Sequence, residues 1–175
     1  DISTWDVSNV YNMNHMFLMA DALSEENKCA IHTSFSSNSN WHYDWSQFAC
    51  NTIFFQPQTK EELQTAVDMW IDDNPTALST YGEINDWDVS LITDMANLFN
   101  NRQTFNNDIS NWNVSNVTNM AYMFFGALSF NQDLSSWDVS NVTDMSFLFS
   151  NTQNFNQDLS SWDVSNVTNM DNLFS

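Results

Sequence analysis

The strongest constraint on the fold is a repeat with a period of about 25 residues and no insertion. Each copy carries a Trp, then Asp or Asn, Val and Ser, and further along an aliphatic residue, a Met and a Phe at fixed offsets. One copy cannot bury so many apolar side chains by itself, whereas stacked copies can. We therefore expect the repeat tryptophans to form the core of a stack: Trp87, Trp112, Trp137 and Trp162.

The spacing within one copy predicts two kinds of local structure. Trp-Asp-Val alternates inward and outward positions, which indicates a short strand. The following Val, Met and Phe recur every three or four residues, which indicates a short helix with one buried stripe. The predicted fold class is therefore an α/β repeat solenoid, with a short parallel strand and a short helix in each copy of the repeat. Because the chain has only two glycines, we expect Asn at its sharp turns.

The repeat is interrupted, and the interruption defines the domain organisation. Residues 1–19 carry an earlier copy of the motif around Trp5, out of phase with the later ones, and are interpreted as the end of a preceding array. Residues 20–54 are interpreted as its C-terminal cap. Residues 55–82 are interpreted as a linker and a helical N-terminal cap, and residues 83–175 as the main solenoid array.

The helical cap has clear sequence signals. Thr59 and Glu62 form a capping box, and an apolar face follows them for three turns. Asn74-Pro75 starts a second, shorter helix, and Gly82 is suited to end it. A helix pair in this position would cover the open end of the array.

Cys29 and Cys50 are the only cysteines in the chain. A disulfide across a loop of this length would contribute roughly 3 kcal/mol. The alternative is a pair of buried free thiols in a reducing compartment.

The charge balance excludes several partners. The chain has 22 acidic and 3 basic residues, a net charge of -19. Nucleic-acid binding needs clustered Lys and Arg, and anionic membranes attract the same groups, so neither is expected as a partner. No run reaches the roughly 18 apolar residues of a transmembrane helix, so we expect no membrane insertion.

The repeat string resembles a known family. Trp-Asp-Val-Ser-Asn-Val-Thr-Asn/Asp-Met followed by Leu-Phe, at positions 137–149 and 162–174, is similar to the repeat of BspA-type surface proteins, which has nearly the same length. The resemblance covers residues 1–17 and 83–175, with departures at Tyr11 and Asn113. It implies a leucine-rich-repeat-like solenoid, an extracellular or cell-surface location, and adhesion or interaction roles. It brings no catalytic residue.

Two sets of coil residues are candidate sites. Four sequons would accept N-linked glycans in a secreted eukaryotic protein, or are simply repeated turns: Asn113, Asn116, Asn141 and Asn166. Three aspartates should lie one above another and would bind calcium, or form a solvated acidic face: Asp88, Asp138 and Asp163. No other cofactor is expected.

Catalysis is not expected, because the three histidines are scattered and form no recognisable pair with a nucleophile or metal motif. The dense cluster at residues 41–45 would bind a carbohydrate or small ligand, or fill the cap.

The leading functional hypothesis is an extracellular structural scaffold, and the alternative is an adhesin that binds a surface protein or glycan. The array stops within a repeat, so it either continues in a longer monomer or stacks head-to-tail on another molecule in a filament.

Overall fold

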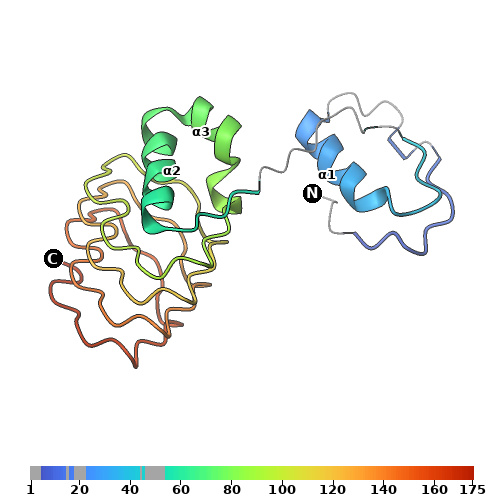
Figure 1. The fold of residues 1–175 in the computed structure, drawn as a ribbon. Helices are drawn as coiled ribbons and strands as arrows, with labels where there is room; N and C mark the ends of the chain where they lie inside the picture. The colour runs from blue at the N-terminus through green and yellow to red at the C-terminus, as the bar shows by residue number, and fades with distance from the viewer. Residues whose placement is uncertain (1–4, 15, 18–22, 44, 46–53) are drawn as a thin grey trace. The chain divides into compact units, whose positions relative to one another are not determined.

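The computed structural model describes residues 5–14, 16–17, 23–43, 45 and 54–175. The chain divides into two compact units, Asp1–Thr52 and Ile53–Ser175, which we call unit 1 and unit 2 (Figure 1). Each unit has a hydrophobic core of its own.

Unit 1 contains one helix, α1 (Glu25–Phe35), among its described residues. The side chain of Ser24 caps this helix by accepting a hydrogen bond from the N–H of Asn27 at 3.2 Å. The helix buries Ile31 and Phe35 against Val7 and Met13 of the Trp5 repeat copy. The early repeat copy therefore supplies part of the core of unit 1.

Unit 2 opens with α2 (Lys60–Asp72) and α3 (Asn74–Tyr81), which confirms the predicted helix pair. The Thr59 hydroxyl accepts from the N–H of Glu62 at 3.2 Å, and the Glu62 carboxylate accepts from the N–H of Gln58 at 2.7 Å. At the other end Gly82 has φ of 72°, a left-handed conformation that glycine adopts without a Cβ penalty.

The two helices lie against the first coil of the repeat array. The short 3₁₀ segment η1 (Ile84–Asp86) leads into this coil. The ring of Trp70 on α2 meets Trp87 edge to face, with centroids 5.9 Å apart. Lys60 pairs with Asp94 at 3.0 Å, and Arg102 pairs with Asp68. Both apolar and ionic contacts therefore fix α2 to the coils.

The prediction of an α/β solenoid is wrong. Among the described residues, the coils after η1 contain no strand, no sheet and no α-helix. Adjacent coils meet at isolated parallel bridges, which join Asp94 to Asn119, Asn119 to Asp144, and Asp144 to Asn169. The chain is a repeat protein whose copies stack through turns.

Local turns explain why no strand forms after each Trp. The side-chain oxygen of the Asp or Asn accepts from the N–H of the Ser two residues later, as Asp138 does from Ser140 at 3.1 Å. The Val carbonyl then accepts from the N–H three residues on, as Val139 does from Val142 at 2.9 Å. These bonds bend the chain and use N–H groups that a ladder would need.

Left-handed residues explain why no helix forms at the Met and Phe positions. One such position recurs in every coil, at Asn97, Tyr122, Phe147 and Asn172, with φ between 51° and 66°. A second recurs at Asn101, Gly126 and Asn151. A right-handed helix cannot pass through these conformations. Asn holds several of them as expected, but Tyr122 and Phe147 do so too, and their rings stack at 4.6 Å.

Hydrogen bonds between coils replace the expected ladder. In residues 95–101, 120–126 and 145–151, every second N–H donates to a carbonyl of the next coil. Met120 donates to Asp144 at 2.9 Å, and Phe124 donates to Leu148 at 3.0 Å. The N–H and hydroxyl of Thr143 both donate to the carbonyl of Thr118, at 2.8 and 3.1 Å. In Figure 1 the coils follow one another from green beside α2 and α3 to red.

Two columns of stacked phenylalanines fill the interior of unit 2. The first has neighbouring centroids 5.3 to 5.6 Å apart with planes within 9° of parallel, and comprises Phe99, Phe124, Phe149 and Phe174. The second has centroids 5.8 and 6.0 Å apart and comprises Phe105, Phe130 and Phe155. Such ring pairs stabilise the fold beyond the area they bury.

Candidate functional site

The repeat tryptophans lie inside unit 2, and their indole N–H groups link neighbouring coils by hydrogen bonds. Trp87, Trp112 and Trp137 are buried, and Trp162 is partly buried. Each later indole N–H donates to a carbonyl of the preceding coil, as Trp112 does to Ile84 at 2.7 Å and Trp137 does to Ile109 at 3.2 Å. These tryptophans fix the register of neighbouring coils.

The column of candidate calcium ligands has a local role. Each carboxylate accepts from the N–H of the following Ser, at 3.0 Å in Asp88, 3.1 Å in Asp138 and 3.0 Å in Asp163. These hydrogen bonds lower the pKa of all three carboxyl groups, and the charge of Asp138 opposes the lowering at Asp163. No group of three or more His, Cys, Asp or Glu side chains suited to a metal occurs in the described part of the chain.

A second acidic column was missed by the sequence analysis. Asp108, Asp133 and Asp158 each accept from the N–H of the Ser two residues later, at 2.9 Å. The hydrogen bonds lower the pKa of Asp133 and Asp158 below the ordinary value. The signal was present in the sequence, because three successive coils repeat Asp, an aliphatic residue and Ser at this offset. Unit 2 therefore carries two acidic columns.

The sequon asparagines divide into two kinds. Asn116, Asn141 and Asn166 each donate their side-chain N–H to a Ser carbonyl of the preceding coil, at 2.7 to 2.8 Å. Asn113 instead accepts from the N–H and hydroxyl of Ser115 through its side-chain oxygen. All four are exposed. The repeated Asn-Val-Thr string thus has a structural role in joining coils.

The predicted disulfide falls partly outside the described residues. Cys29 lies in α1, is buried and is disulfide-bonded. Cys50 is not among the described residues. The pairing with Cys50 therefore stays a prediction.

The aromatic cluster of residues 41–45 packs in unit 1, and Asp44 lies outside the described residues. Trp41 and Trp45 lie against the core, and the indole N–H of Trp41 donates to Nδ1 of His32 at 2.9 Å. His42 is exposed and stacks on Tyr43, with ring centroids 4.6 Å apart. These contacts favour the interpretation that the cluster fills the unit, although His42 and Tyr43 retain exposed surface.

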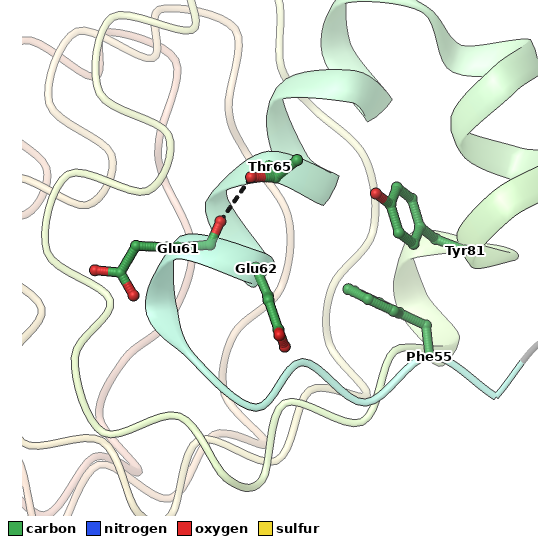
Figure 2. A pocket seen from close by; sticks show the side chains of 5 residues that line it. All are labelled: Phe55, Glu61, Glu62, Thr65 and Tyr81. Carbon is green, nitrogen blue, oxygen red and sulfur yellow. Dashed lines mark hydrogen bonds between the residues drawn. The ribbon is translucent and has the colours of Figure 1, made fainter.

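Unit 2 also contains a pocket that the sequence analysis did not predict. Its volume is about 250 Å³, and Figure 2 shows the five side chains that line it: Phe55, Glu61, Glu62, Thr65 and Tyr81. The first turns of α2 supply the two glutamates and the threonine, while Phe55 precedes that helix and Tyr81 ends α3. The pocket thus combines two aromatic rings with carboxylates.

One family model matches this chain, over residues 1–76 and 69–175, and it is described as "Mycoplasma protein of unknown function, DUF285". The chain belongs to this family. The DUF285 match covers the repeats of both units, so it shows a repeat-type family, and the finer BspA-type assignment stays a prediction. No curated protein and no solved structure matches the DUF285 chain. None of the helices in its described residues is both long enough and apolar enough to cross a bilayer.

Proposed function

We propose that this DUF285 protein is an extracellular or cell-surface structural protein in which unit 2 serves as a stiff, acidic scaffold. The observation that supports this proposal is the regular bonding between coils. Equivalent main-chain bonds recur from coil to coil at Met120, Met145 and the threonines, and the phenylalanine columns run beside them. A stack held at every coil resists bending and local opening.

The surface chemistry supports a scaffold role. The side chains of Asp138, Asp133 and Asn141 are exposed, and all three are occupied in hydrogen bonds of the coils themselves. The high negative charge of the chain, -19 overall, favours solubility and disfavours anionic partners.

The cell-surface location rests on two observations. Cys29 is disulfide-bonded, and disulfides persist mainly in oxidising environments. The repeat string also resembles BspA-type surface repeats. If the source is a secreting eukaryote, the four exposed sequon asparagines are candidates for N-linked glycans: Asn113, Asn116, Asn141 and Asn166.

We further propose that the scaffold assembles head-to-tail, because coil-on-coil contact is the interaction that unit 2 repeats along its axis. Electron micrographs of the native material test this. Rods or fibrils with a spacing set by the coil stack are expected. A second test treats intact cells with a label that cannot cross the membrane. The proposal is overturned if the micrographs show dispersed monomers and the label does not modify this protein.

A further inference from the structure

We propose that the pocket of Figure 2 binds a basic side chain, a lysine ammonium or an arginine guanidinium, presented by a protein partner. This inference goes beyond the scaffold role, because it assigns a ligand-binding site to the start of α2. It depends on ring geometry, unpaired negative charge and the size of the pocket.

The aromatic rings form two walls at an angle. The centroids of Phe55 and Tyr81 are 4.5 Å apart, and their planes differ by 52°. Both rings also contact the buried Trp87, at 5.2 and 6.0 Å, so a rigid base holds them in place. A cation within about 6 Å of an aromatic ring face is attracted by the ring quadrupole. At 4.5 Å the two rings touch each other, so a cation cannot lie between them; it would lie against the surface of the ring pair that lines the pocket.

The two carboxylates of the pocket point in different directions, and neither pairs with a cation of the described residues. Figure 2 shows the Glu62 side chain on the side of the pocket opposite Phe55 and Tyr81, whereas the Glu61 carboxylate is directed away from the rings. The bond from the N–H of Gln58 fixes Glu62 at 2.7 Å. Within the described residues, neither glutamate takes part in an ion pair.

The nearby basic residues are already engaged elsewhere. Lys60 and Arg102 are the basic residues of positions 53–175. Lys60 pairs with Asp94 at 3.0 Å, and Arg102 pairs with Asp68 and Asp72. Neither can neutralise Glu62 without giving up a contact between α2 and the coils. A cation for this pocket therefore has to come from outside unit 2, and we propose a partner protein as its source.

The size and polar groups of the pocket favour a side chain over a larger ligand. Its volume of about 250 Å³ is below the range of roughly 300–1,000 Å³ that holds drug-sized ligands. The Tyr81 hydroxyl makes no hydrogen bond to a described residue, so it is available to accept one from an ammonium or guanidinium group. An extended alkyl stem would lie along the two rings.

The test is an NMR titration of the full chain with N-acetyl-lysine methylamide, N-acetyl-arginine methylamide and the neutral N-acetyl-norleucine methylamide. We expect saturable shifts of the Phe55 and Tyr81 ring signals with the two cations, with Kd in the millimolar range. The norleucine probe has a similar stem and no charge, so it should give no saturable shift.

Two matched variants separate a direct contact with Glu62 from the general electrostatic attraction of the acidic chain. Glu62→Gln should weaken lysine binding by about five-fold, because the amide oxygen still caps α2 but the negative charge of the pocket is lost. Glu61→Gln removes the same charge one residue away and should change Kd by less than about two-fold. Equal binding of norleucine, equal effects of the two variants, or no saturation by either cation would each overturn the proposal.

Discussion

The Trp-Asp-Val-Ser motif occurs in both units, and only part of its structure is the same in each. In unit 1 the Ser8 N–H donates to Asp6 at 3.0 Å, and in unit 2 the Ser90 N–H donates to Asp88 at the same distance. The Trp side chains differ. Trp5 is 56% exposed, whereas Trp137 is 4% exposed. The turn is thus a property of the motif, and the burial of its Trp is not.

The same contrast occurs within unit 2. Phe149 is 3% exposed between the rings of Phe124 and Phe174, whereas Phe174, in the next coil, is 64% exposed. The two residues occupy equivalent positions of the repeat, each in a Leu-Phe-Ser string. A coil therefore supplies its apolar side chains, and the neighbouring coils on both sides bury them.

The largest expected effect contrasts Trp137→Ala with Trp5→Ala. Trp137→Ala should destabilise unit 2 by about 3–5 kcal/mol, because it leaves a cavity and removes the bond to Ile109. Trp5→Ala should cost unit 1 less than about 1 kcal/mol. Urea denaturation followed by NMR signals of each unit measures the two separately. Similar losses in both units would contradict the contrast.

A smaller effect is expected for the left-handed turn at Gly126. Gly126→Ala should cost unit 2 about 1–2 kcal/mol, because φ is 66° and the new Cβ would lie 2.7 Å from the side-chain oxygen of Asn101. Gly126→Asn is the control for the backbone conformation, since it adds the same Cβ, and Asn101 and Asn151 hold this left-handed conformation in neighbouring coils. The melting temperature of the full chain measures the effect of both substitutions. A smaller loss for Ala than for Asn would refute the explanation.

The bond from Asn141 to the preceding coil should contribute about 1 kcal/mol. Asn141→Ala is therefore expected to destabilise unit 2 by that amount. Asn9 occupies the same motif position in unit 1 and donates to no described residue, so Asn9→Ala should leave the stability of unit 1 unchanged. Chemical denaturation distinguishes the two variants. Equal effects would mean that the Asn acts within its own turn.

The smallest expected effect is in the response to acid, which the two units should share. Hydrogen bonds from Ser8 and Ser140 lower the pKa of Asp6 and Asp138 in the folded state. The stabilisation is therefore present above the unfolded pKa of about 3.9 and is lost as pH falls below it. Carboxyl NMR titrations should give lowered pKa values in both units. Asp138→Asn should remove this local pH dependence, as Asn113 preserves the turn without a titrating group. An ordinary pKa at either aspartate would show that its turn does not form.

The helix pair at residues 60–81 was predictable because its signals are local. Thr59, Glu62 and Gly82 define the ends within a few residues, and the apolar stripe of α2 needs one surface to pack on. For the described coils, the same kind of reasoning predicted a strand and a helix that do not form. The alternation of the coils and their spacing of three or four residues matched strand and helix periods, but the turn after each Trp replaces the strand, and left-handed residues such as Tyr122 and Phe147 prevent the helix. Nothing in the sequence marks these aromatic residues as left-handed.

The candidate sites also divide into those with a signal in the sequence and those that only the packing creates. The two acidic columns follow from the period alone, although only one was recognised. The pocket at Phe55 and Tyr81 was not predictable, because its walls come from two segments that the packing of α2 and α3 brings together.

The sequence by itself determined the period of the repeat, the turn after each Trp and the helix pair before the array. Those features depend on interactions between residues a few positions apart. The tertiary structure alone decided which tryptophans are buried, how the coils bond and where the pocket lies. Those features depend on surfaces that exist only when one coil lies against another, or when a helix lies against a coil.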